Sequence, residues 1–183
     1  MKQQNVVPAD STWIDKKVTE FRGSAWERIY KDWMLITAGD VTTDKGNWNT
    51  MTAAWGGFGI LWGKEVAFMV IRPSRHTFNF VNDASLFSLS FFDKSKRDVL
   101  TICGEKSGRD IDKAAAAGLN PIVFENGAIG FKEATEIMIC RKLYTHDVDP
   151  AKFLDVPAIE AHYPHKDYHR MYVGEIIGFK VRP

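Results

Sequence analysis

The sequence predicts a mainly β fold, an antiparallel barrel whose strands are joined by a few short helices. About six to eight short segments are rich in β-branched and aromatic residues and are bounded by Gly, Pro or Asn-Gly signals. The helical patterns between them are short and do not alternate regularly with the strands, which argues against a doubly wound sheet. The length of 183 residues fits one domain, which we assign to residues 26–183, preceded by a loose N-terminal arm over residues 1–25.

Each predicted strand has a recognisable boundary. Residues 33–39 form an apolar run that stops at a glycine, and residues 66–71 are continuously apolar, which predicts a strand buried on both faces. Asn126-Gly127 is a strong signal for a two-residue turn, so a hairpin is expected around it. The remaining predicted strands are residues 50–58, which follow a predicted turn at residues 46–49, and residues 86–92, 121–125, 129–131, 134–144 and 172–181.

Short helices are expected in the connections. Ser74 is the predicted N-cap of a helix that runs to Asn82, and residues 94–103 have the pattern of a second helix. Residues 110–117 are rich in alanine and stop at a glycine, which favours a third. Residues 149–167 contain three prolines and are expected to be irregular.

Composition excludes several classes of function. The 24 basic and 23 acidic residues give a net charge of +1 without long runs of one sign, so a nucleic-acid partner is not expected. A mean hydropathy of −0.23 and the lack of a long apolar run predict no membrane span and no secretory signal, hence a cytoplasmic protein. Cys103 and Cys140 belong to no CxxC pair, so two reduced, buried thiols are expected.

Two common binding motifs are incomplete, because residues that they require are missing at the required positions. The glycine cluster in residues 56–63 has Trp62 where a dinucleotide fingerprint needs its third glycine. His162, His165 and His169 do not complete a metal-binding pattern, so no metal is expected. No GxSxG nucleophile motif is present, and we assign no catalytic residue.

The segment from Arg72 to Thr77 follows a predicted strand and opens a predicted helix. It offers two guanidinium groups, two hydroxyl groups and backbone N–H groups at a helix start. These are the groups that bind a phosphate monoester, through charge-assisted hydrogen bonds and the helix N-terminus. The alternative is a capped surface turn with solvated arginines.

The segment of residues 47–55 suits a flat ligand. Ala53 and Ala54 leave room above the backbone, while Asn49, Thr50 and Thr52 offer amide and hydroxyl groups. A planar heterocycle can lie along such a strand with its edge atoms hydrogen-bonded. The alternative is an ordinary barrel strand that begins in a polar turn.

Five segments in this order resemble the flavin-reductase-like family of FMN-binding split barrels, in particular its flavoredoxin-like branch. They span most of residues 28–182. The segments are Asn49 to Trp55, Arg72 to Thr77, Phe87 to Phe91, Ser107 to Lys113 and Tyr168 to Glu175.

The resemblance implies a homodimer with FMN near the subunit interface. It implies that residues 49–53 contact the flavin ring and ribityl chain, that residues 72–77 surround the phosphate end, and that residues 103–107 lie near the ring or tail. Thr52 is a candidate donor to the flavin N1–C2=O edge, and Trp55 is expected to border a stacked nicotinamide. The implied FMN-binding residues are Asn49, Thr50, Met51, Thr52, Ala53, Trp55, Arg72, Ser74, Arg75, Thr77, Ser88, Ser90, Phe91, Cys103, Gly104, Ser107, Lys113, Tyr168 and His169.

The expected activity is that of an NAD(P)H-dependent FMN oxidoreductase. NADH or NADPH would reduce the flavin, which would pass electrons to a small-molecule or redox-protein acceptor. Two alternatives stay open: an electron-transfer flavoprotein reduced by a protein partner, and a non-catalytic FMN-binding barrel.

Overall fold

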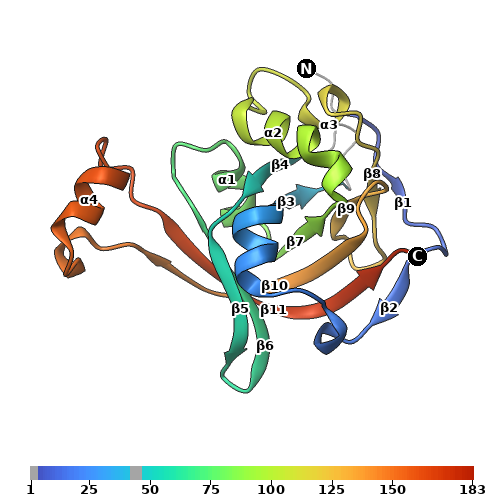
Figure 1. Cartoon of the computed structure of the whole chain (residues 1–183). Coiled ribbons are helices and arrows are strands. Elements are labelled where there is room, and N and C mark those ends of the chain that lie inside the picture. The colour runs from blue at the N-terminus through green and yellow to red at the C-terminus, as the bar shows by residue number, and fades with distance from the viewer. Residues whose placement is uncertain (1–3, 42–46) are drawn as a thin grey trace.

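The computed structural model describes residues 4–41 and 47–183, and its main feature is one curled antiparallel sheet (Figure 1). The strand order is β4-β3-β7-β10-β11-β6-β5, and β2 pairs with the free end of β11. The seam of the barrel lies where β4 approaches β6. The strands are β2 (Ile14–Lys16), β3 (Met34–Asp40), β4 (Asn47–Ala53), β5 (Gly56–Leu61), β6 (Lys64–Ile71), β7 (Leu86–Phe91), β10 (Glu136–Asp147) and β11 (Arg170–Val181). The mainly β fold predicted from the sequence is confirmed.

A second, three-stranded sheet covers part of the barrel. Its strands are β1 (Val7–Pro8), β8 (Pro121–Val123) and β9 (Ile129–Phe131), and β1 runs parallel to β8. The predicted hairpin is confirmed: Gly127 has φ +86°, and Asn126 Oδ1 accepts a hydrogen bond of 3.1 Å from the backbone N–H of Ala128. Glycine is favoured there because other residues rarely adopt this backbone conformation.

Two hydrophobic cores follow from the alternation of side chains along the strands. On β3, Ile36 faces the barrel interior and Leu35 faces the second core, between the main sheet, the small sheet and the helices. Each such fully buried aliphatic side chain stabilises the fold by roughly 1.5–3 kcal/mol. β6 departs from the prediction of burial on both faces, because Phe68 on its outer face is 37% exposed.

The helices are α1 (Thr77–Asp83), α2 (Arg97–Glu105), α3 (Lys113–Ala116) and α4 (Val156–His162), with short 3₁₀ turns η1 (Val18–Glu20), η3 (Lys94–Lys96) and η4 (Pro150–Lys152) and a π-helix η2 (Glu27–Asp32). Two expectations were wrong. Ser74 is not an N-cap, because a turn precedes α1, which begins at Thr77. Residues 149–167 contain α4, since Pro157 stands in its first turn, where proline is tolerated.

The N-terminal arm is not loose over the residues that the structure describes. β2 extends the sheet beside β11, and Phe21 packs its ring against Phe58, Phe91 and Phe179 at centroid distances of 5.5, 5.1 and 5.7 Å. Residues 1–3 lie outside the described residues. The domain boundary after residue 25 stays a prediction.

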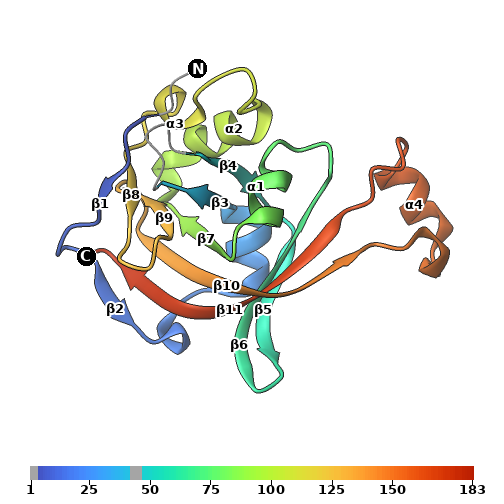
Figure 2. The same ribbon diagram turned by 180° about the vertical axis from the view of Figure 1, so that it is seen from behind.

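β10 and β11 continue beyond the barrel as a two-stranded ribbon. Between them the chain forms a projecting loop, residues 148–169, which carries α4 well away from the barrel body (Figures 1 and 2). Cys103 and Cys140 are both buried and unpaired with each other, as predicted. No helix in the described ranges is long and apolar enough to cross a membrane.

Candidate functional site

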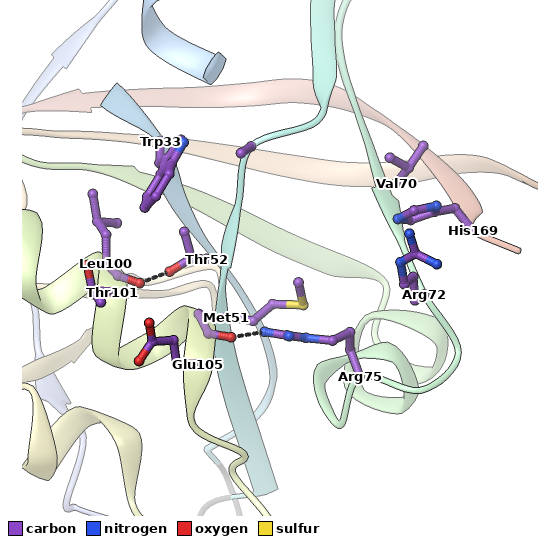
Figure 3. Close-up of a pocket in the computed structure, with 12 residues that line it drawn as sticks. Trp33, Met51, Thr52, Val70, Arg72, Arg75, Leu100, Thr101, Glu105 and His169 are labelled. Carbon is purple, nitrogen blue, oxygen red and sulfur yellow. Dashed lines mark hydrogen bonds between the residues drawn. The ribbon is translucent and has the colours of Figure 1, made fainter. Parts of the chain in front are cut away.

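A cavity of about 370 Å³ opens at the barrel seam, between the end of β4, the end of β6 and helix α2 (Figure 3). Its volume falls in the range of roughly 300–1,000 Å³ that is usual for small-ligand sites. The lining residues are Trp33, Met51, Thr52, Ala54, Val70, Arg72, Arg75, Leu100, Thr101, Gly104, Glu105 and His169.

Arg75 forms a cationic wall of this cavity. It stands in the turn between β6 and α1, and its Nη2 donates a hydrogen bond of 2.5 Å to the backbone carbonyl of Gly104 at the end of α2 (Figure 3). Burial lowers the pKa of the guanidinium. Within the described residues no carboxylate stands within 4 Å of Arg75 in an ion pair. The guanidinium therefore keeps its charge uncompensated at the cavity edge.

Lys113 adds positive charge behind the same wall. Its buried Nζ donates to the carbonyls of Thr50 and Cys103 at 3.0 and 2.9 Å. Burial lowers the pKa of Lys113 to about 8, and the nearby Arg75 also contributes to lowering it. Carbonyl oxygens solvate the ammonium but do not neutralise it, so this end of the cavity attracts anions.

His76 lies near Arg109 and Lys113 but lines a neighbouring hollow rather than the seam cavity. Its pKa is lowered by burial and by the charges of Arg109 and Lys113. Its Nδ1 is buried and makes no hydrogen bond within the part of the chain that the structure describes. Arg109 reaches back across the loop and donates to the carbonyl of Ser74 at 3.4 Å.

Glycines let the chain after α2 lie close on β4. A Cβ atom at Gly108 would fall 2.3 Å from Oδ1 of Asn49, and one at Gly104 would fall 3.3 Å from Cβ of Thr52. Neither position tolerates a larger side chain without a shift of its neighbours. Residues 104–109 are thereby held beside the turn that carries Arg75.

Apolar and aromatic side chains form much of the remaining lining. Trp33 and Leu100 lie at one end, Met51 lies beside Arg75, and Val70 lies next to His169 (Figure 3). The Arg97 guanidinium lies 3.3 Å from the Trp33 ring centroid and donates to the carbonyl of Lys31 at 2.6 Å. Such a wall can bury a flat ring while the cationic end holds a charged tail.

The structure does not bring the side chains of residues 72–77 together at one point, and their binding of one anion stays a prediction. Arg72 Nη1 pairs with Oδ1 of Asp167 at 2.8 Å, and the Ser74 hydroxyl donates to Oδ2 of the same carboxylate at 3.2 Å. Thr77 is buried and accepts a hydrogen bond of 2.9 Å from Nδ2 of Asn49. Only Arg75 of this group faces the cavity without an acidic partner, because Asp167 arrives from the distant projecting loop.

His169 lines the cavity and is tied to the projecting loop. Its Nδ1 lies 2.8 Å from the hydroxyl oxygen of Tyr163, and the Trp55 ring packs 5.0 Å from the imidazole centroid. Burial, then the charge of Arg72, lower the pKa of His169 to about 4. The imidazole is therefore neutral near pH 7.

Several predicted binding residues do not line the cavity. Ser88 donates to the carbonyl of Ile129 and Thr50 to that of Ile36, so both hydroxyls are used inside the fold. Burial raises the pKa of the Cys103 thiol to about 11. The others outside the lining are Asn49, Ala53, Trp55, Ser74, Thr77, Ser90, Phe91, Ser107, Lys113 and Tyr168.

Thr52 lines the cavity, but its hydroxyl donates to the carbonyl of Leu100 (Figure 3). This hydrogen bond docks α2 on β4, and the role of Thr52 as a donor to a flavin edge stays a prediction.

Sequence reasoning missed part of the lining, namely Trp33, Val70, Leu100, Thr101 and Glu105. The sequence pattern predicted Val70 as part of a buried strand and Leu100 as part of the apolar face of a helix, and gave no sign that either lines a cavity. Trp33 reaches the cavity because its φ of +63° turns the chain between η2 and β3, and no local signal marks that turn. Among the described residues, no cluster of three or more His, Cys, Asp or Glu side chains is arranged to hold a metal ion.

Comparisons with known proteins agree with this fold. A sequence model of the family described as "Flavin reductase like domain" matches residues 27–183. No curated protein sequence matches the chain.

Solved structures share the fold at low identity. An FMN-binding domain of a flavin reductase-like enzyme from Shewanella baltica OS155 is 13% identical, with 93% of this chain and 77% of that chain covered and a TM-score of 0.63. The flavoredoxin of Desulfovibrio vulgaris (Miyazaki F) is 20% identical, with 91% and 76% covered and a TM-score of 0.62. Nitrilotriacetate monooxygenase component B from Bacillus cereus is 14% identical, with 82% and 69% covered and a TM-score of 0.64. These likenesses confirm the predicted split-barrel fold.

Proposed function

Because the chain belongs to the family of flavin reductase-like domains, we propose that it binds FMN in the seam cavity and carries electrons from NADH or NADPH to an acceptor. The observation that carries the proposal is the half-buried Arg75 guanidinium, which faces the cavity without a carboxylate partner among the described residues. A buried cation is costly unless an anion pairs with it, and a phosphate monoester supplies that anion.

The cavity fits the two ends of FMN. Arg75 would hold the phosphate by a planar, charge-assisted fork, and Lys113 behind it would strengthen the positive potential. Trp33, Met51 and Leu100 would cover the ring and exclude water from it.

When bound, FMN supplies the chemistry, accepting a hydride at its ring and passing electrons on. The side chains of this chain bind the tail, orient the ring and keep the surroundings dry. His169 keeps the wall uncharged near pH 7, so the charge of Arg72 is balanced by Asp167 alone.

Anaerobic reduction tests this function. Purified protein loaded with FMN is mixed with NADH or NADPH without oxygen, and the flavin absorbance near 450 nm is followed. Loss of the absorbance with at least one nucleotide is expected. If neither nucleotide bleaches the flavin, the proposed donor is wrong and reduction by a protein partner takes its place.

We also propose that the protein is a homodimer. The outer surface of β5, β6, β10 and β11 is not covered by the small sheet or the helices, and we call it the open sheet face (Figures 1 and 2). Leu61, Phe68, Tyr144 and Ile177 on it are each 37–44% exposed. Val70, which lines the cavity, lies on the same face of β6 as Phe68, two residues away. A second copy covering this face would meet the cofactor cavity.

A further inference from the structure

A second hollow lies beside the seam cavity, and Ala54 lines both. This hollow, which we call the aromatic groove, has a volume of about 500 Å³ between η2 and the start of β5. Its lining residues are Ala25, Trp26, Ile29, Tyr30, Ala54, Trp55, Gly56, Gly57 and Phe58.

The groove is uncharged and rich in exposed rings. None of its lining residues is ionisable near neutral pH. Trp26 and Tyr30 on one wall are 82% and 73% exposed, and Trp55 on the other is 42% exposed. Gly56 and Gly57 leave bare backbone between the walls. Rings that expose this much area can bury it against a flat, uncharged molecule, whereas a charged ligand would be desolvated there without a partner.

The wall that carries Trp26 and Tyr30 is held in place at both ends. The Arg28 guanidinium pairs with Glu136 of β10 and lies 4.6 and 4.8 Å from the ring centroids of Phe21 and Phe91. At the other end of η2, Arg97 of α2 donates to the carbonyl of Lys31. The groove is therefore formed before any ligand arrives, which reduces the entropic cost of binding.

The same element also joins the groove to the seam cavity. η2 presents Trp26 and Tyr30 to the groove, and Trp33, directly after it, lines the cavity. π-Helical turns are rare and often mark functional sites. A ligand in the groove would lie next to whatever occupies the cavity, because Ala54 lines both hollows.

We propose that the aromatic groove binds the electron acceptor and that this acceptor is a neutral planar compound of the quinone class. The inference rests on the proposed function for its electron source. The overall reaction would be NAD(P)H + H⁺ + quinone → NAD(P)⁺ + hydroquinone: the nicotinamide is oxidised and the quinone gains two electrons and two protons.

Equilibrium dialysis of the full-length, FMN-loaded protein with 1,4-naphthoquinone tests the site without requiring turnover. Both cysteines are buried, so addition of the quinone to a thiol does not compete. Trp26→Ala and Tyr30→Ala should each weaken binding roughly threefold to tenfold, the range expected for loss of one aromatic stacking partner. Tyr30→Phe, which keeps the ring, and Leu154→Ala, an exposed apolar residue of the projecting loop, should bind like the wild type.

A second experiment compares the binding of a neutral quinone with that of an anionic one. The anion of 2-hydroxy-1,4-naphthoquinone should bind the wild type at least tenfold more weakly than 1,4-naphthoquinone. Equal binding of the two compounds, or unchanged binding by both alanine variants, would overturn the proposal. So would a change of sedimentation from dimer to monomer in Trp26→Ala, because the groove would then be an interface between copies.

The experiments distinguish failure of the proposed nucleotide donor from failure of the proposed quinone site. If quinone binding follows the predicted variants but neither nucleotide reduces the flavin, the groove stands as a binding site and the donor is wrong. If a nucleotide does reduce the flavin and the alanine variants bind quinone normally, the acceptor site is wrong and the proposed function stands.

Discussion

Among single residues, the hydrogen-bond partner of each arginine determines whether its guanidinium is available to bind an anionic ligand. Arg72 and Arg75 stand three positions apart in one turn, yet Arg72 is paired with Asp167 and Arg75 meets only a backbone carbonyl. A guanidinium that already has a carboxylate gains little from a further anion, whereas one without a carboxylate gains a full charge-assisted hydrogen bond. Arg75 is for this reason the residue that we expect to dominate retention of the phosphate.

Replacing Arg75 tests this assignment. Arg75→Ala should weaken FMN binding by about 1.5–3 kcal/mol, the value of a hydrogen bond to a charged group, which corresponds to roughly tenfold to a hundredfold in Kd. Arg75→Lys should restore only part of the loss, because lysine lacks the planar fork. Fluorescence titration with FMN measures both.

Lys132→Ala is the control, because this exposed cation follows β9 in the small sheet, away from both the seam cavity and the open sheet face. Its FMN affinity should equal that of the wild type. An unchanged Kd in Arg75→Ala, with the fold intact by circular dichroism, would contradict the assignment of the phosphate end.

His169 gives the fold a dependence on acid pH. Its pKa is about 4 in the folded protein and near 6.5 in an unfolded chain. As the pH falls from about 6.5 to 4, the unfolded chain binds a proton that the folded protein does not, so the free energy of unfolding decreases by about 3 kcal/mol. Urea unfolding across this pH range measures the loss.

His169→Asn removes the titration and keeps a polar δ atom near Tyr163. Its stability should fall less steeply between pH 6.5 and 4, while His165→Asn, which changes an exposed histidine, should follow the wild type. Parallel curves for all three proteins would show that His169 does not titrate as the structure indicates.

At the scale of elements, the projecting loop depends on a few contacts at its base. Asp167 accepts from both Arg72 and Ser74, and the carbonyl of His162 accepts a hydrogen bond of 2.7 Å from Arg72. α4 packs on little of the barrel, so these contacts and the Tyr163–His169 hydrogen bond hold the loop toward the cavity rim. Because Arg72 and His169 also line the cavity, loss of these contacts is expected both to loosen the projecting loop and to change the shape of the cavity.

Hydrogen exchange of Asp167→Asn tests this coupling. The substitution keeps the shape of the side chain but removes its charge, so the amides of residues 150–166 should exchange about threefold to tenfold faster, corresponding to roughly 1 kcal/mol for a half-buried ion pair. Asp15→Asn, which loses an exposed pair with Lys180, should leave this region unchanged. Unchanged protection in Asp167→Asn would show that the loop is held by its apolar contacts alone.

At the scale of the whole molecule, the covering of the main sheet is uneven. The small sheet, α2 and α3 bury one half of its outer surface, and the open sheet face is left with exposed apolar side chains. Contiguous exposed apolar area of this kind is typical of an interaction surface. A twofold pairing of identical faces is the simplest way for a soluble chain to bury it.

Sedimentation velocity tests the homodimer. Phe68→Arg places a charge in the middle of the open sheet face and should shift the protein from dimer to monomer at micromolar concentration. Leu154→Arg, on the fully exposed tip of the projecting loop, should sediment like the wild type. A monomeric wild type, or an unchanged dimer in Phe68→Arg, would refute the proposed interface.

Local signals predicted most of the elements but fewer of the contacts. The apolar runs at residues 33–39 and 86–92 became β3 and β7, and the Asn-Gly turn became the hairpin between β8 and β9. These features depend on side-chain periodicity and turn chemistry, which a sequence displays directly. The helix α4 and the π-helix η2 were not predicted, because Pro157 concealed the first and packing of Arg28 and Arg97 holds the second.

Residue order is enough to predict the β architecture, the family resemblance and a cationic segment after β6. That Arg75 faces the cavity while Arg72 is neutralised by Asp167, 95 positions away, follows from the folded arrangement. So does the placement of Trp33 and Leu100 on one wall. Periodicity and turn preference act between neighbours in the chain, whereas ion pairing and cavity formation depend on which distant segments the folded barrel brings together.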